Sequence, residues 1–120
     1  MDESESTLRS LAVHDEQVIR SVLATGLGSP DALGIDAKTC ALVRLAVVID
    51  LDASIASYQS AVSLALATGA TTSDIVDTLR AVAALVGCSR LVAAAPALAV
   101  ALDYDIGAAL EDCHPAAHQP

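Results

Sequence analysis

Arg44 is the side chain of this sequence that most needs an explanation, because it lies in the middle of a long apolar run. A guanidinium is always charged, so in apolar surroundings it needs a carboxylate, a carbonyl or an anionic ligand. Arg44 therefore either forms a structural ion pair, with Asp50, Asp52 or a neighbouring subunit, or binds the carboxylate of a substrate. The ion pair is the simpler interpretation.

Four further polar side chains, Ser54, Ser57, Tyr58 and Gln59, follow in the next apolar run. Ser54 and Tyr58 are four residues apart and would share one face of a helix. These groups either make interior hydrogen bonds or line a pocket with Arg44, in which Tyr58 and Gln59 act as catalytic groups and the two serines help to bind substrate. No nearby histidine would activate a serine as a nucleophile.

The chain has three cysteines, Cys40, Cys88 and Cys113, and none of them forms a C-x-x-C pair. An odd number argues against a disulfide framework and for free thiols in a reducing compartment. Cys40, one helical turn before Arg44, and Cys88, which follows a glycine, are expected to be buried packing residues.

The histidines give only a weak metal signal. His14 is expected on a solvated helix face, and His114 and His118 lie with Cys113 in a tail that offers no further ligands. A tight site needs about four converging ligands. We therefore predict neither a metal nor another cofactor.

Length and composition indicate one all-helical domain that associates with copies of itself. A chain of 120 residues forms a single core. Its residues are 54% hydrophobic but only 2% aromatic, so the apolar side chains are mostly small and suit closely packed helices. A protomer this apolar is expected to cover part of its surface with other subunits.

Charge argues against nucleic-acid and membrane partners. The net charge is −9 and Lys38 is the only lysine, whereas phosphate binding needs a basic surface. The acidic residues 1–6 lack the positive segment of a secretory signal, which predicts a cytoplasmic location. Residues 81–102 are long enough to span a membrane, but Arg90 and Pro96 interrupt them, so buried or interface helices are expected instead.

In the first half of the chain, residues 1–6 are expected to be disordered, and one helix is predicted over residues 7–24, followed by a glycine- and proline-rich loop. Asp36 would cap a helix over residues 37–50 that is apolar on all sides and therefore central. A helix over residues 53–68 would then bury one stripe. The stripe consists of the apolar residues Ile55, Val62 and Leu66, and Gln59 interrupts it.

In the second half, Thr71 and Asp74 form a capping box for a helix over residues 73–86. Its buried face is predicted to be Ile75, Leu79, Val82 and Val86. A helix over residues 89–102 is expected to be broken or kinked at Pro96, and Asp105 would cap a short helix to residue 111. The fold class is thus all-α, a bundle of about six helices over residues 7–112, with a loose tail over residues 113–120.

Two segments of the sequence form a recognisable pair, namely Leu-Gly-Ile-Asp-Ala-Lys-Thr at 33–39 and Ala-Leu-Ala-Thr-Gly-Ala-Thr-Thr-Ser-Asp-Ile at 65–75. Together they resemble the carboxymuconolactone decarboxylase family, which includes the alkylhydroperoxidase D-like proteins. The second is close to the family pattern A-x-x-x-G-A-T-x-x-E-I. The resemblance implies a small all-α protomer that assembles as a homotrimer or homohexamer.

The residues that the family's redox members use are missing. The resemblance places the two cysteines of their C-x-x-C at Ser54 and Ser57, their histidine at Ala61 and their glutamate near Ala41. A serine hydroxyl is too weakly acidic to replace a thiolate, so peroxidase activity is not expected.

Three hypotheses follow. The first is a cofactor-independent lyase-type enzyme acting on a small anionic lactone or keto acid, which Arg44 would bind. The second is a non-catalytic oligomeric binding or scaffold protein. The third, a thiol peroxidase that uses Cys40 or Cys88, is disfavoured because neither has a resolving cysteine.

Overall fold

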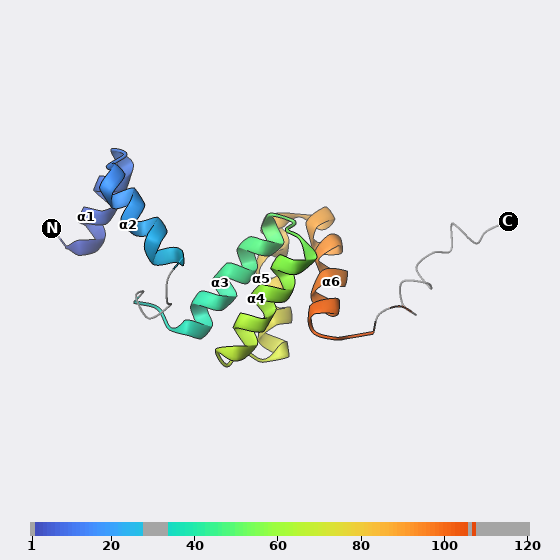
Figure 1. Cartoon of the computed structure of the whole chain (residues 1–120). Coiled ribbons are helices and arrows are strands. Elements are labelled where there is room, and N and C mark those ends of the chain that lie inside the picture. Colours follow the sequence, from blue (N-terminus) through green and yellow to red (C-terminus); the bar gives the residue numbers. More distant parts are fainter. Residues whose placement is uncertain (1, 28–33, 106, 108–120) are drawn as a thin grey trace. The chain divides into compact units, whose positions relative to one another are not determined.

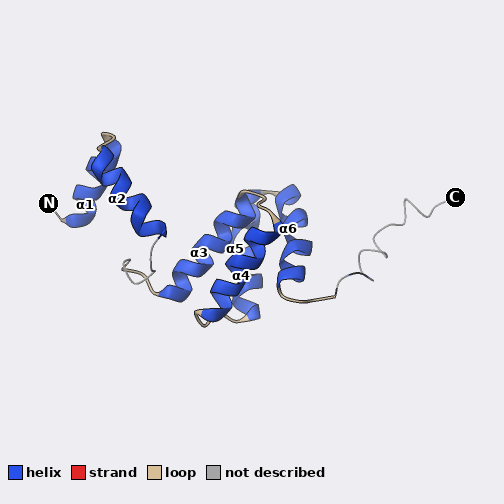
Figure 2. Cartoon of the chain, viewed as in Figure 1, coloured by secondary structure: helices blue, strands red, loops and turns tan. Residues whose placement is uncertain are grey.

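The computed structural model describes residues 2–27, 34–105 and 107 (Figure 1). All regular structure in these residues is helical, as Figure 2 shows, which confirms the all-α prediction. The chain divides into two compact units, Met1–Ala37 and Lys38–Pro120. The predicted extent of the domain, 7–112, reaches beyond the described residues and stays a prediction.

The first unit is a pair of helices, α1 (Glu3–Ala12) and α2 (Glu16–Leu27), that pack against each other. Helix α1 begins inside the segment expected to be disordered. The carboxylate of Asp2 accepts a hydrogen bond from the Glu5 amide at 2.7 Å, and Glu3 and Glu5 place negative charge in the first turn. Both features stabilise a helix N-terminus, which explains the early start.

The single helix predicted over residues 7–24 is wrong, because the chain turns at His14. This residue has φ +59°, in the left-handed region that stops a helix. Asp15 then caps α2, since its Oδ1 accepts hydrogen bonds from the amides of Gln17 at 3.1 Å and Val18 at 3.3 Å. His14 is exposed, as expected, but in this turn rather than on a helix.

The second unit contains the other four helices, α3 (Ala37–Asp50), α4 (Ile55–Ala67), α5 (Thr72–Val86) and α6 (Cys88–Ala101). Helix α6 packs against α4 and α5, which also contact each other (Figure 1). All four helices contribute side chains to one core, and its largest fully buried side chains are Tyr58, Leu45, Ile49, Ile75 and Val62.

Helix α3 is only half covered within the second unit, which corrects the expectation of a central helix. Leu45 and Ile49 are fully buried, but Val43 and Val47 on the other side are 53% and 52% exposed. The apolar residues of this helix therefore extend beyond the core of its own unit.

Helix α4 buries a different face from the predicted one. Gln59 is exposed, and Ile55 and Leu66 are 51% and 43% exposed, so only Val62 of that stripe is in the core. The buried residues are instead Tyr58, Ala61, Val62 and Ala65. Small side chains permit close packing against α6, whose buried residues are also mostly alanines.

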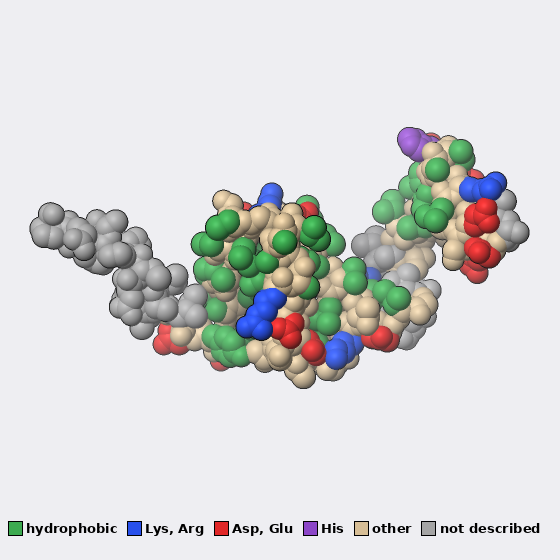
Figure 3. Space-filling model, turned by 180° about the vertical axis from the view of Figure 1, so that it is seen from behind, with side chains coloured by type: hydrophobic (Ala, Val, Ile, Leu, Met, Phe, Trp, Pro, Cys, Tyr) green, Lys and Arg blue, Asp and Glu red, His purple; other side chains and the backbone are tan. Residues whose placement is uncertain are grey.

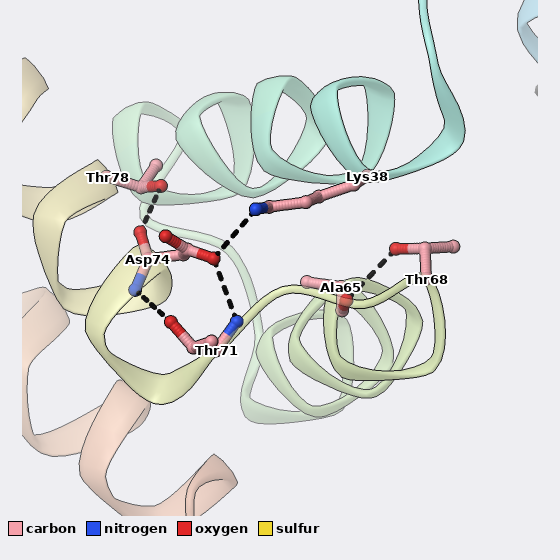
Figure 4. A network of polar contacts seen from close by, with 6 residues as sticks. All are labelled: Lys38, Ala65, Thr68, Thr71, Asp74 and Thr78. Carbon is pink, nitrogen blue, oxygen red and sulfur yellow. Dashed lines mark hydrogen bonds and ion pairs between the residues drawn. The ribbon is translucent and has the colours of Figure 1, made fainter.

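Helix α5 begins as predicted, with the capping box shown in Figure 4. The Thr71 hydroxyl accepts from the Asp74 amide at 3.0 Å, and the Asp74 carboxylate accepts from the Thr71 amide at 2.9 Å. Lys38 at the start of α3 adds an ion pair with Asp74 at 3.1 Å (Figure 4). These interactions lower the pKa of the Asp74 carboxyl, and the hydrogen bond from the Thr71 amide has the largest effect.

The predicted buried face of α5 is confirmed: Ile75 is fully buried, and three partly buried residues pack against the core, namely Leu79, Val82 and Val86. Gly87 joins α5 to α6 with φ +88°, a conformation that glycine adopts without strain.

Helix α6 continues through Pro96, so the helix is not broken there, and the alternative of a kink stays a prediction. Proline leaves the carbonyl four residues earlier without its helical partner. That residue, Val92, lies on the exposed side of α6, where water can solvate the carbonyl. Most of the short helix predicted after Asp105 and the tail over residues 113–120 lie outside the described residues.

The two described cysteines differ. Cys40 is 4% exposed and packs as expected, whereas Cys88 at the start of α6 is exposed, which corrects its assignment as a packing residue. Cys113 lies outside the described residues. Among the helices that the structure describes, none combines the length and the apolar character needed to cross a membrane.

Candidate functional site

A pocket of about 310 Å³ lies between α3 and α4 and contains two of the predicted site residues, Arg44 and Ser57. We call it the α3/α4 pocket, and the residues that line it are Arg44, Val48, Ser57, Ser60, Ala61 and Leu64. The lining thus combines one guanidinium and two hydroxyls with three apolar side chains, those of Val48, Ala61 and Leu64.

Helical spacing explains why these residues meet. Arg44 and Val48 are four residues apart on α3, and the four α4 residues follow the i, i+3, i+4, i+7 pattern of one helix face. Arg44 is half-buried, so its charge is partly shielded from water. Charge-assisted hydrogen bonds gain strength in such surroundings.

Ser54 has a structural task next to the pocket. It is the N-cap of α4: its hydroxyl accepts from the Ser57 amide at 3.2 Å and also donates to the Ser57 hydroxyl at 3.1 Å. Ser54 therefore fixes the position of Ser57, which lines the pocket, without lining it itself.

Tyr58 and Gln59, the predicted catalytic pair, are not among the lining residues of the pocket. Tyr58 is 1% exposed, and its buried hydroxyl has no hydrogen-bond partner among the described residues. Burial raises the pKa of this hydroxyl, as does the negative charge of Asp52, while Arg90 acts in the opposite direction. Gln59 is exposed on the surface of α4.

Three residues of the pocket, Val48, Ser60 and Leu64, were missed by the sequence analysis. A signal for Ser60 was available, because it is three residues after Ser57 and so shares its helix face. The sequence offers no comparable signal for Val48 and Leu64, since their neighbours along the chain do not distinguish them from the other aliphatic residues of α3 and α4.

The positions at which the resemblance places redox residues do not gather a reactive centre. Ala41 is buried in the core, Ser54 caps α4, and Ser57 and Ala61 line the α3/α4 pocket. Within residues 2–27, 34–105 and 107, no group of three or more His, Cys, Asp or Glu side chains is placed to hold a metal ion.

A second surface feature is an apolar groove between α3 and α5. This α3/α5 groove has a volume of about 410 Å³ and is lined by Val43, Ala46, Val47, Asp50, Val82, Leu85 and Val86. Leu85 is 86% exposed, although it is one of the largest apolar side chains of the chain. In the view of Figure 3, apolar side chains occupy a large share of the surface of the α3–α6 unit.

Comparisons with known proteins leave the resemblance without independent support. No protein-family model, no curated protein and no solved structure matches this chain.

Proposed function

We propose that this chain is a non-redox helical protein that assembles with copies of itself through the α3/α5 groove. The observation that carries the proposal is the exposure of Val43, Val47 and Leu85 along one groove. The resemblance to the carboxymuconolactone decarboxylase family suggests a trimer or a hexamer as the product.

The energetic argument rests on apolar area. Burying apolar surface contributes about 25 cal/mol per Å², and contiguous apolar patches on a surface typically mark interaction sites. The groove is flanked by helices and has one charged lining residue, Asp50, at the C-terminal end of α3. A second copy is the proposed occupant, because the mostly uncharged lining of the groove suits a surface of the same kind.

Sedimentation velocity on three variants tests this assembly. In Val47→Glu and Leu85→Glu a carboxylate enters the groove, and we expect both to sediment as smaller species than the wild type because burying the charge is unfavourable. The matched control is Val92→Glu, which changes an exposed apolar residue of α6 outside the groove and is expected to sediment like the wild type.

Two results would contradict the proposal. One is a wild-type protein that sediments as a monomer over the accessible concentration range. The other is a Val47→Glu variant that stays as large as the wild type while its circular dichroism shows an intact fold.

The second candidate is a cofactor-independent lyase-type enzyme that acts on a small lactone or keto acid. The shared lining of the α3/α4 pocket by Arg44 and Ser57 favours it. Turnover distinguishes an enzyme from a binding protein. Consumption of such a compound by the wild type but not by Arg44→Met would support catalysis. Binding of the compound without turnover would exclude catalysis on that compound.

A further inference from the structure

We infer that the α3/α4 pocket binds a small aliphatic monocarboxylate, with its carboxylate on Arg44 and the hydroxyls of Ser57 and Ser60. This inference goes beyond the proposed assembly and concerns the pocket of the second candidate function, but it requires no turnover there. Its first support is the composition of the lining, which joins one cation and two hydroxyls to three apolar side chains, Val48, Ala61 and Leu64.

The charge of the pocket selects a monoanion. Among the described residues that line the pocket, Arg44 is the only charged one. A planar guanidinium matches one carboxylate through two parallel hydrogen bonds. The chain as a whole has a net charge of −9, so each further negative charge on a ligand would be repelled. Di- and triphosphates are therefore poor candidates.

Arg44 has enough donors to bind a ligand in addition to its contacts within the protein. It already takes part in an interaction inside the chain. A guanidinium carries five N–H donors, so a bidentate carboxylate would use two of them. The hydroxyls of Ser57 and Ser60 can rotate to donate to the carboxylate, and Ser57 meanwhile accepts from Ser54 at 3.1 Å.

Size and apolar lining define the rest of the ligand. At about 310 Å³ the pocket is at the small end of the range for ligand sites. Val48 and Leu64 present branched aliphatic side chains, which suit a short branched hydrocarbon rather than a sugar or a nucleotide. A branched acid of about five carbon atoms has this combination of a single charge and a compact apolar end.

Titration with 3-methylbutanoate, followed by methyl NMR on the full chain, tests this assignment. At pH 7 we expect shifts at the methyl groups of Val48, Ala61 and Leu64. The neutral ligand control is 3-methylbutanamide, which has the same hydrocarbon without the charge. Equal binding of the acid and the amide would overturn the inference.

Protein variants test the role of Arg44. Arg44→Met should weaken binding of 3-methylbutanoate by at least about tenfold, because it removes charge-assisted hydrogen bonds. The matched control Arg80→Met removes the same charge from the exposed side of α5 and should change affinity by less than about twofold, because exposed charges are screened.

A second variant keeps the test decisive if Arg44→Met does not fold. Ser60 is exposed, so Ser60→Asp should preserve the fold while placing a carboxylate next to the proposed ligand anion. We expect it to weaken binding by at least about tenfold through charge repulsion. Unchanged binding in a folded Ser60→Asp overturns the inference. Because this readout is separate from sedimentation, either proposal can fail while the other stands.

Discussion

Tyr58 has the largest side chain in the core, and its hydroxyl is buried without a hydrogen-bond partner among the described residues. The ring fills space between the helices, so its apolar part stabilises the core. The hydroxyl has the opposite effect, because it loses its hydrogen bonds to water on folding. At the scale of single residues, packing rather than hydrogen bonding therefore explains this tyrosine.

Replacing Tyr58 with phenylalanine should raise the free energy of unfolding by about 1 kcal/mol, since it removes an unpartnered polar group and keeps the ring. Urea denaturation at pH 7 measures the effect. The exposed Tyr104 provides the matched control, because Tyr104→Phe should leave stability unchanged. A loss of about 1 kcal/mol in Tyr58→Phe would instead mean that the hydroxyl has a partner in solution.

The raised pKa of Tyr58 adds a pH dependence with a definite sign. The hydroxyl ionises near pH 10.0 in the unfolded chain and at higher pH in the folded protein. The unfolded state therefore loses its proton first, and stability falls as the pH rises above about 10. This alkaline loss should be smaller in Tyr58→Phe than in the wild type.

At the scale of elements, the N-terminus of α5 is held by a capping box and by an ion pair with α3. Thr71 and Asp74 satisfy each other's amides, and Lys38 connects this cap to the start of α3 (Figure 4). The cap sets where α5 starts and therefore which of its faces meets the core through Ile75.

Thr71→Ala should lower the free energy of unfolding by about 1 kcal/mol, because the Asp74 amide loses its capping acceptor. Chemical denaturation measures this change. Ser73→Ala is the control: Ser73 is exposed in the first turn of α5 and should change stability by less than about 0.5 kcal/mol. Equal losses in both variants would argue against the capping box as the source of the effect.

At the scale of the whole molecule, an apolar surface is combined with strong negative charge. Each copy has a net charge of −9, so copies repel one another, whereas the proposed interface at the apolar α3/α5 groove would favour their association. Salt weakens the repulsion, because the Debye length falls to about 3 Å at 1 M, but it does not weaken apolar contacts.

Self-association should therefore become stronger as sodium chloride is raised from 50 mM to 1 M. Sedimentation velocity at several protein concentrations measures the shift toward the larger species. Dissociation by salt would instead indicate an interface held by ion pairs, and it would contradict assembly through the α3/α5 groove. The Val47→Glu variant should show a much smaller response.

Several features of the fold could be predicted from the sequence because they depend on neighbours along the chain. The capping box of α5, the end of that helix at Gly87 and the helical class all follow from backbone chemistry within about four residues. The turn at His14 was missed although Asp15 marks the start of α2 in the same local way. In the candidate site, local spacing alone relates Ser54 to Ser57 and Ser57 to Ser60.

The sequence by itself thus determined the helical class, the capping box of α5 and the presence of serines rather than cysteines at positions 54 and 57. Only the tertiary structure decided that α4 buries Ala61 and Ala65 rather than Ile55 and Leu66. The physical reason is that burial depends on how closely a partner helix can approach, and small residues permit the closest approach. The same choice of faces brings Arg44 of α3 to Ser57 and Ser60 of α4 and leaves Val43 and Val47 exposed.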